Sequence, residues 1–283
     1  DSASQLILEL IDTAWMQRLR RIRQTGNTHL VYMFAEHSRF GHSLGVAYLA
    51  NLLMKQLKHH NKEEIEKYEH AVAAAALLHD IGHVAPGSHL AEKVWAKNAQ
   101  HEKISIRIIE EDKEIREILN SYDKNLSKDI CRILAEDKSL PPWTYAIISG
   151  EGWNADRGNW TIVDSEMCSV SYGRYNVAAL IDAFRISPNG ELIIQENRLD
   201  ALTHFYVARD SMYRQVYQHR ALQAVDSISK NIVKRLREID LENIFADETM
   251  SSAIKSKNYA SELNLTEIFS MDEAWWQYHL SKW

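Results

Sequence analysis

Two histidines and a carboxylate occupy positions where the surrounding sequence is apolar. His79 and Asp80 follow an apolar run from Ala71 to Leu78, and His42 shares the apolar stripe of an earlier predicted helix. Desolvating an ionisable side chain is costly unless it is paired, and the helix dipole also opposes a carboxylate at a helix C-terminus. A bound cation would remove both penalties. Two histidines with carboxylates suit a divalent ion such as Fe, Mn, Zn or Ni.

Both histidines also have structural alternatives. The dipole favours a histidine at a helix C-terminus, which would account for His79 alone. A lone core histidine such as His42 is more often a hydrogen-bonded structural residue than a ligand. Two predicted helices that each offer a histidine to one core, with a carboxylate beside one of them, favour the metal interpretation.

The elements that must position these residues are helices. Apolar residues recur at helical spacing through most of the chain, and capping residues, Pro and Gly mark the ends. Helices are predicted over residues 6–24, 42–60, 61–82, 90–99, 102–119, 127–135, 141–150 and 199–236, the last as one helix or two. Residues 151–159 are polar and are predicted as a loop, whereas Asn189 and Gly190 predict a tight hairpin within 185–194. We expect an all-α helical bundle with one small β-hairpin.

Composition narrows the class of protein further. The 283 residues are 45% hydrophobic and include only 10 Gly and 4 Pro, which argues against a turn-rich all-β fold. The net charge of −6 does not favour nucleic-acid binding. Cys131 and Cys168 cannot form a disulfide framework and suit a cytoplasmic protein. No apolar run approaches about 18 residues, so neither a membrane span nor a membrane partner is expected.

Several segments, in order along the chain, resemble one enzyme family. The runs SRFGHSLG (38–45) and LLHDIGH (77–83) resemble the HD-domain metal-dependent phosphohydrolases. Residues 11–24, 170–175 and 209–219 are similar to the dGTPase-like branch, the deoxynucleoside triphosphate (dNTP) triphosphohydrolases. The resemblance implies an HD-type helical bundle.

The resemblance covers roughly residues 11–227, which would hold the metal core. No convincing linker interrupts the chain, so we predict one domain over residues 1–283. Residues 228–283 would form its C-terminal helical tail, in which Trp275 and Trp276 pack against the body.

The resemblance also implies a fourth metal ligand. Counting back from residues 170–175 places residues 154–165 on the family pattern without a gap. Asp156 then takes the metal position and Asp164 the later, substrate-side position; the alternative for Asp156 is a surface pair with Arg157. The implied ligands are His42, His79, Asp80 and Asp156. They would hold one divalent transition metal (Mn, Fe, Ni or Zn, with Mg also considered), which lowers the pKa of bound water and polarises a phosphoryl oxygen.

Three further histidines are implied to face the substrate phosphates. In the family one follows the HD motif, one lies in the next loop and one belongs to a His-Glu pair. His83, His89, and His101 with Glu102 match these positions, although the loop that carries His89 is one residue longer than usual. Each could instead be a surface residue. His101 is our candidate proton donor to the leaving oxygen.

The resemblance implies nucleotide contacts outside the metal set. Arg39 would face the nucleotide, although it could also pair with Glu36 near its predicted helix start. The remaining implied contacts are Gln24, Trp160, Asp164, Arg209 and Tyr217. The ring of Tyr217 would exclude a 2′-hydroxyl, whereas Trp160 replaces the usual Tyr and removes a phenol near the sugar.

The leading hypothesis is metal-dependent hydrolysis of a dNTP to deoxynucleoside and triphosphate, by a chain that we expect to form a homo-oligomer. Changes beside the metal set, such as Gly41 in place of the usual Glu, leave two alternatives open. One is an HD phosphohydrolase for another nucleotide, a monophosphate or a guanosine polyphosphate. The other is a catalytically silent nucleotide-binding regulatory module.

Overall fold

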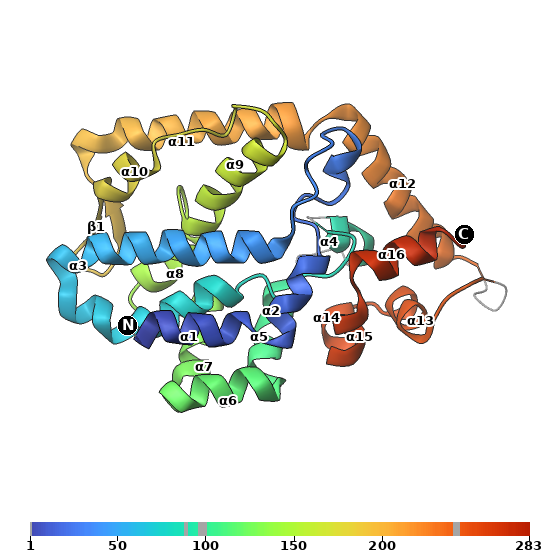
Figure 1. Ribbon diagram of the computed structural model, residues 1–283, viewed down its shortest axis with the longest axis horizontal. Coiled ribbons are helices and arrows are strands. Elements are labelled where there is room, and N and C mark those ends of the chain that lie inside the picture. The colour runs from blue at the N-terminus through green and yellow to red at the C-terminus, as the bar shows by residue number, and fades with distance from the viewer. Residues whose placement is uncertain (1, 88–89, 96–100, 240–243) are drawn as a thin grey trace.

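The computed structural model describes residues 2–87, 90–95, 101–239 and 244–283 (Figure 1). Within these ranges the fold is all-α apart from one two-stranded sheet, as the sequence predicts. The helices and strands are α1 Ser2–Ile11, α2 Ala14–Arg18, α3 Arg39–Leu78, α4 Leu90–Trp95, α5 His101–Glu111, α6 Lys113–Tyr122, α7 Leu126–Leu134, α8 Trp143–Ser149, α9 Ala155–Met167, α10 Val177–Ala183, β1 Phe184–Ile186, β2 Leu192–Ile194, α11 Leu199–Met212, α12 Arg220–Leu236, α13 Glu248–Lys255, α14 Tyr259–Glu262, α15 Leu265–Ser270 and α16 Glu273–Leu280.

Helix α3 folds back on itself at Asn61. The backbone there leaves the helical region (φ −134°, ψ 48°), and Figure 1 shows the two halves running in opposite directions. A straight helix would separate His42 from His79 by about 55 Å at ~1.5 Å per residue, but their ring centroids lie 5.5 Å apart. The break confirms the predicted boundary between residues 42–60 and 61–82. It brings the two histidines to the same end of the helix pair.

Local capping corrects three of the predicted elements. The helix predicted over 6–24 is divided at Thr13, whose hydroxyl donates to the Leu10 carbonyl oxygen at 2.7 Å. The helix predicted over 102–119 is divided at Asp112, whose carboxylate accepts from the Ile115 amide at 2.9 Å. The loop predicted over 151–159 is wrong from Ala155 onward, because Asn154 accepts from the Arg157 amide and caps α9.

The remaining predicted elements follow the sequence closely. The hairpin pairs β1 with β2 antiparallel, with Gly190 at a positive φ of 76° in its turn. Residues 199–236 form α11, a π-helical turn over Tyr213–Tyr217 and α12. Of the helix predicted over 90–99, residues 90–95 form α4, and residues 96–99 lie outside the described residues. None of the described helices combines the length and the apolar character needed to cross a membrane.

The C-terminal helices α13–α16 lie at one end of the molecule, beside α4 and α12 (Figure 1). Trp276 is buried, and its ring meets that of Trp95 edge-on at 5.7 Å, so the predicted packing of the tail is confirmed. The assignment of residues 1–283 to one domain stays a prediction.

Arg18 ties this tail to the loop that follows α3. Its guanidinium is buried and donates to the carbonyl oxygen of His83 at 2.7 Å. It also donates to three carbonyl oxygens around the end of α15, those of Ile268, Phe269 and Met271. Burial lowers the pKa of Arg18 to about 9, which leaves it charged at neutral pH. One side chain therefore donates to four backbone carbonyl oxygens of the loop and the tail.

Replacing Arg18 by Met should lower the free energy of unfolding by at least about 3 kcal/mol, because the carbonyl oxygens of His83 and Phe269 lose their donor. Urea denaturation measures the change. Arg235→Met is the matched control, since Arg235 and Glu238 are both exposed where they pair at 3.2 Å. That variant should lose less than about 1 kcal/mol. Equal losses in both variants would contradict the role assigned to Arg18.

Candidate metal centre and the adjoining cavity

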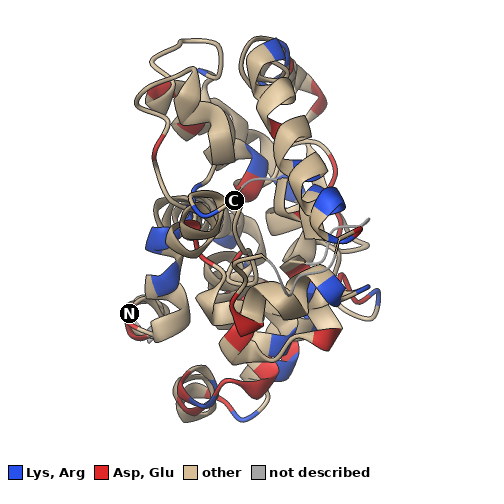
Figure 2. Cartoon of the chain, turned by 90° about the vertical axis from the view of Figure 1, so that its right-hand side faces the viewer, with Lys and Arg blue, Asp and Glu red and all other residues tan. Residues whose placement is uncertain are grey.

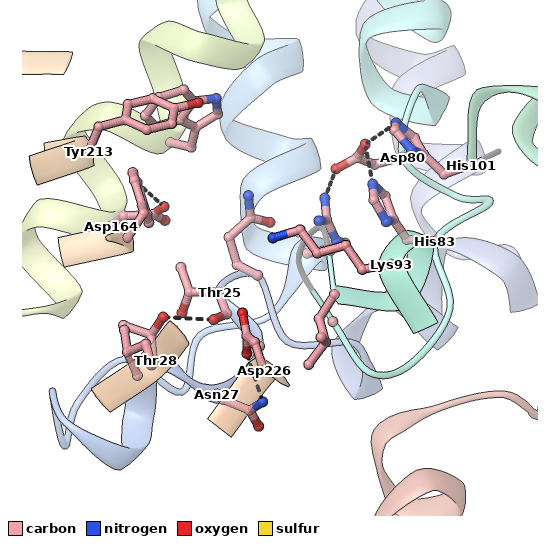
Figure 3. A pocket seen from close by; sticks show the side chains of 18 of the residues that line it. Thr25, Asn27, Thr28, Asp80, His83, Lys93, His101, Asp164, Tyr213 and Asp226 are labelled. Atoms are coloured by element: carbon pink, nitrogen blue, oxygen red, sulfur yellow. Dashed lines mark hydrogen bonds and ion pairs between the residues drawn. The ribbon is translucent and has the colours of Figure 1, made fainter. Parts of the chain in front are cut away.

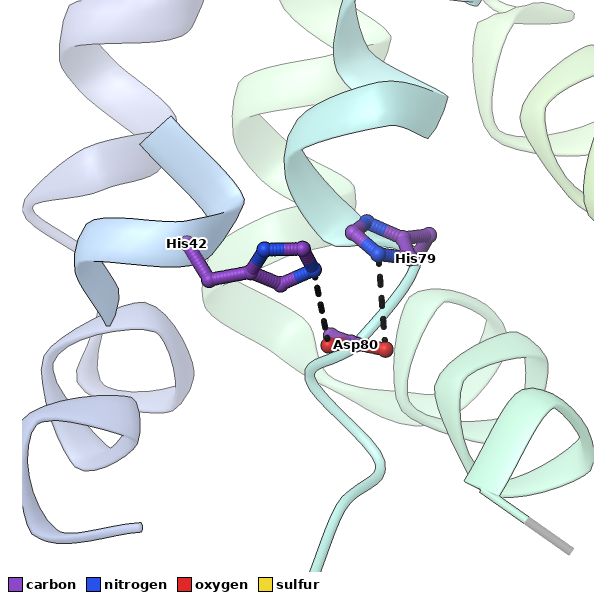
Figure 4. Close-up of side chains that lie close together, drawn as sticks. All are labelled: His42, His79 and Asp80. Atoms are coloured by element: carbon purple, nitrogen blue, oxygen red, sulfur yellow. Dashed lines mark ion pairs between the residues drawn. The ribbon is translucent and has the colours of Figure 1, made fainter. Parts of the chain in front are cut away.

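The four predicted metal ligands converge where α3 and α9 meet. His42 lies in the first turn of α3, His79 and Asp80 directly after its last turn, and Asp156 in the first turn of α9. Figure 4 shows the two imidazoles directed toward Asp80, with Nε2 of His42 and His79 at 3.6 and 3.4 Å from its oxygens. Oδ1 of Asp156 lies 3.0 Å from Nε2 of His42 and 3.9 Å from Nε2 of His79.

The hydrogen bonds of the two histidines fit a bound cation. Nδ1 of His42 lies 2.8 Å from the side-chain oxygen of Asn159, and Nδ1 of His79 lies 2.9 Å from the carbonyl oxygen of Ala76. A proton on each Nδ1 leaves a lone pair on each Nε2. Both Nε2 atoms are buried and have no hydrogen-bond partner among the described residues. The His42–His79–Asp80 cluster can therefore hold a divalent metal ion.

Asp80 remains ionised although it is buried. Burial alone would raise the pKa of its carboxyl, but the neighbouring His79, Arg39 and His83 outweigh that effect and hold it well below its usual range. Asp156 behaves in the same way, because the neighbouring His42 and His79 hold its pKa low although desolvation opposes them. The cluster thus offers two carboxylate anions to a cation at any pH near neutrality.

Two further histidines stack beside Asp80. The rings of His83 and His101 lie 3.9 Å apart and nearly parallel, with their Nε2 atoms 3.3 and 3.9 Å from Asp80 Oδ1. Burial, Arg39 and His101 lower the pKa of His83 well below its usual value. Burial also acts to lower the pKa of His101, but Glu92, Asp80 and Glu102 raise it overall. His83 is therefore neutral at neutral pH, whereas the surroundings of His101 favour its protonated form.

Glu92 in α4 fixes the orientation of His101. Its Oε1 lies 2.6 Å from Nδ1 of His101, so Nε2 is the nitrogen that faces Asp80. Glu102 approaches the same ring at 3.6 Å but is largely exposed. The sequence prediction included His101 and Glu102 and missed Glu92, for which no pattern in the sequence gives a signal.

Arg39 lies against Asp80 rather than Glu36. Its Nη1 donates to Oδ2 of Asp80, so the alternative of a pair with Glu36 is wrong for the described structure. Its Nε is buried and has no partner among the described residues. Arg39 and the two stacked histidines therefore border the same carboxylate from different sides.

A cavity of about 800 Å³ opens beside this cluster (Figure 3). Predicted site residues that line it are Gln24, Arg39, Asp80, His83, His101, Glu102, Asp156, Trp160, Asp164, Arg209 and Tyr217. His42 and His79 are not among its lining residues. The predicted contact His89 lies outside the described residues.

Asp164 lies in the cavity wall within a network that the sequence only partly revealed. Its two oxygens lie 2.7 Å from Nε2 of His37 and 2.6 Å from the hydroxyl of Tyr217. Burial and the charge of Asp164 raise the pKa of Tyr217 well above its usual value, so the phenol keeps its proton and donates it. Trp160 meets Tyr217 edge-on at 5.6 Å, and Arg209 lies 5.8 Å from the Trp160 ring centre.

Asn159 is the other functional residue that the sequence analysis missed. It orients His42, and Gly45 leaves room for it because a methyl group at Gly45 would collide with the Asn159 amide. Residues three apart on a helix share a face. Asn159 follows Asp156 by three, so a helical prediction for residues 155–167 would have found it.

The comparisons with known proteins agree with this arrangement. The HD domain family matches residues 39–155. The chain is 30% identical to the uncharacterized protein YwfO of Bacillus subtilis over 279 residues, which cover 99% of this chain and 63% of that protein. It is 28% identical to human deoxynucleoside triphosphate triphosphohydrolase SAMHD1 over 257 residues, which cover 79% of this chain and 41% of that protein.

Solved structures extend the likeness over nearly the whole chain. A phosphohydrolase from Bacteroides thetaiotaomicron has a TM-score of 0.81 at 27% identity, and a hypothetical protein from Aquifex aeolicus has 0.77 at 30%. Each alignment covers 98% of this chain and 68% of the other. The all-α fold with His and Asp side chains paired at the ends of its helices is that of an HD domain. The chain belongs to the HD-domain phosphohydrolase family, and it spans less than two thirds of the length of either curated relative.

Removal of one carboxylate from the cluster should remove the metal. We expect about one divalent ion per wild-type chain and a small fraction of that in Asp80→Ala and Asp156→Ala, since each loses an anionic ligand. Elemental analysis of purified protein gives the content. Asp164→Ala is the control, because Asp164 lines the same cavity without approaching the two histidines. Absence of metal from wild type, or full occupancy in Asp80→Ala, would rule the site out.

Proposed function

We propose that the chain hydrolyses a dNTP to deoxynucleoside and triphosphate. The observation that carries this proposal is that the cluster around Asp80 and the Asp164–Tyr217 pair open on one cavity. The first can act on phosphate and the second can contact a sugar. Relatives named as deoxynucleoside triphosphate triphosphohydrolases support this choice of substrate.

His42, His79, Asp80 and Asp156 would hold the metal, for which we propose Mn, Fe, Ni or Zn, with Mg also compatible with the carboxylates. A divalent ion in that cluster would supply activated water and polarisation of a phosphoryl oxygen. Side chains of the protein would bind the phosphates, protonate the leaving oxygen and select the sugar. Arg39 and Arg209 line the cavity and offset phosphate charge.

His101 is positioned to protonate the departing 5′ oxygen. Its raised pKa favours the protonated form, and Glu92 holds Nδ1 so that Nε2 faces the reaction site. Its neighbour His83 is neutral, so the pair holds one proton rather than two. Environments that push two adjacent titratable groups apart in pKa are characteristic of acid–base pairs. We therefore assign the general acid to His101 and leave His83 as a phosphate contact.

The wall formed by Tyr217, Trp160 and Asp164 would select the sugar. Asp164 can accept from a 3′-hydroxyl, while the Tyr217 ring occupies the space that a 2′-hydroxyl would need. Trp160 donates no phenolic hydrogen bond, so we expect weaker binding of the sugar and a high KM. Gln24 lies at the same cavity and supplies a further polar contact.

We also propose a homo-oligomer. Four neighbouring apolar residues, from the last residue of η2 (Gly26–Leu30) into the segment before α3, are exposed, namely Leu30, Val31, Met33 and Phe34. Contiguous exposed apolar surface of this kind marks interaction sites more often than free surface.

His101→Ala should lower kcat by about 10²- to 10⁴-fold while metal remains bound, because the leaving oxygen loses its proton donor. The activity of wild type should fall as the pH rises through the pKa of His101. Glu92→Gln removes the charge that raises this pKa, so the alkaline limb of its kcat profile should move to lower pH. Turnover near that of wild type in His101→Ala would assign the acid to another group.

Tyr217→Ala should relax the preference for deoxyribose. Wild type should favour dGTP over GTP in kcat/KM, and the ratio should fall when the ring is removed, since the penalty against a 2′-hydroxyl is steric. Paired kinetics on the two nucleotides measure it. Tyr206→Ala is the control, because Tyr206 is exposed on α11 and does not line the cavity. Equal efficiencies in wild type would contradict a sugar gate.

A further inference from the structure

A carboxylate lies in the part of the cavity that is remote from the metal cluster. Asp226 of α12 and Asn27 of η2 both line the cavity, and Nδ2 of Asn27 donates to Oδ1 of Asp226 at 3.1 Å. Figure 3 shows these two residues together with Thr25 and Thr28 in one corner, apart from Asp80, His83 and His101.

The charges along the cavity give it a direction. Arg39 and His101 lie beside Asp80, and Figure 3 shows the Lys93 side chain extending from that side toward the middle of the cavity. The opposite corner offers hydroxyl and amide groups and the Asp226 carboxylate. Acidic and basic residues are otherwise interspersed over the helices (Figure 2), so this polarity is local. A phosphate chain is attracted to the first end and repelled by Asp226, which leaves the base to the corner of Asp226.

Asp226 has acceptor capacity to spare. Among the described residues it makes one side-chain hydrogen bond, to Asn27, and no ion pair. An ionised carboxylate accepts at both oxygens and donates at neither, so Oδ2 is available to a ligand. The side-chain oxygen of Asn27 adds a neighbouring acceptor. This corner therefore requires hydrogen-bond donors from whatever occupies it.

Only one of the common bases offers two adjacent donors on one edge. Guanine presents N1–H beside its 2-amino group, whereas adenine and cytosine place a ring-nitrogen acceptor next to their amino group. A carboxylate facing that acceptor would leave two lone pairs opposed and desolvated, at a cost that a hydrogen-bonding site uses to reject the wrong ligand. The geometry points to a guanine subsite. We infer that Asp226 accepts from N1–H and the 2-amino group while Asn27 holds the carboxylate in place.

This inference rests on the proposed function and names the base of its substrate. The test keeps sugar and phosphates constant and changes only position 2 of the purine. Wild type should favour dGTP over deoxyinosine triphosphate, which lacks the 2-amino group, by about 10- to 100-fold in kcat/KM, the range for a hydrogen bond to a charged group. In Asp226→Asn that advantage should disappear. Deoxyxanthosine triphosphate should improve in this variant, because the new amide can donate to its 2-oxo group.

Asp210→Asn is the matched control. It makes the same change on α11, where Asp210 pairs with Arg214 at 2.8 Å in solvent, and it should leave the ratio between the bases as in wild type. Equal efficiencies for the guanine and hypoxanthine nucleotides in wild type would overturn the inference. So would a preference for guanine that survives in Asp226→Asn.

Failure of the proposed function is distinguishable from failure of the inference. If the metal-loaded chain hydrolyses none of these nucleotides, the proposed function fails. Calorimetric binding of the same nucleotides to wild type and Asp226→Asn then decides the base subsite. Tighter binding of dGTP that is lost in the variant supports the inference. Equal binding, or no binding, overturns it.

Discussion

The burial of one carboxylate constrains the centre of this molecule. Asp80 is 3% exposed, and an ionised carboxylate that is removed from water is costly unless opposing charges surround it. Its partners come from three places: Arg39 and His42 at the start of α3, His79 and His83 after its end, and His101 at the start of α5. The charge is stabilised only when α3 folds back at Asn61 and α5 packs beside it. The fold of α3 and α5 therefore stabilises Asp80, and the same arrangement assembles the candidate site.

The need to surround Asp80 also gives the C-terminal helices a role, although their side chains do not line the cavity: they hold the loop that carries His83. The loop after Asp80 must hold His83 against His101, and hydrogen bonds from its backbone to the C-terminal helices help to fix its position. The Ala85 amide donates to the Met271 carbonyl oxygen at 2.9 Å, and the Gly87 amide donates to Glu273 at 2.6 Å. Gly87 has no room for a side chain, because a methyl group there would collide with the Arg23 carbonyl oxygen. The tail therefore acts as a scaffold for the loop, with Arg18 joining the two.

The sequence predicts most helices because their apolar spacing is local information. It also predicts the cluster around Asp80, since ionisable residues on apolar stripes need partners that can only be one another or a cation. The boundaries at Thr13 and Asp112 are missed because a single side-chain cap can end a helix inside an unbroken apolar pattern. Residues 155–167 are misjudged for the reverse reason: Asn154 starts a helix in a segment whose composition is polar.

Partners that lie far apart in the chain are beyond the reach of such patterns. His37 reaches Asp164 across 127 residues, and nothing in the local sequence of either marks the contact. Glu92 lies only nine residues before His101, but the two residues belong to different helices, α4 and α5, and helical periodicity sets no register between one helix and the next. Periodicity describes one element at a time, so it identifies which residues are buried and not which elements supply their partners.

Neighbouring charges determine both which of the two histidines beside Asp80 holds a proton and in which direction a nucleotide lies in the cavity. Burial and Arg39 hold the pKa of His83 down, whereas Glu92 raises the pKa of its neighbour His101, so His101 is the ring of the stacked pair that holds a proton more readily. That proton lies at the cationic end of the cavity, where a phosphate chain is drawn, and not at the end that holds Asp226. A nucleotide bound in the opposite direction would place its phosphates against a carboxylate and its base among buried charges that it could not satisfy. Charge placement, rather than the shape of the cavity, therefore determines which end of a nucleotide meets the acid.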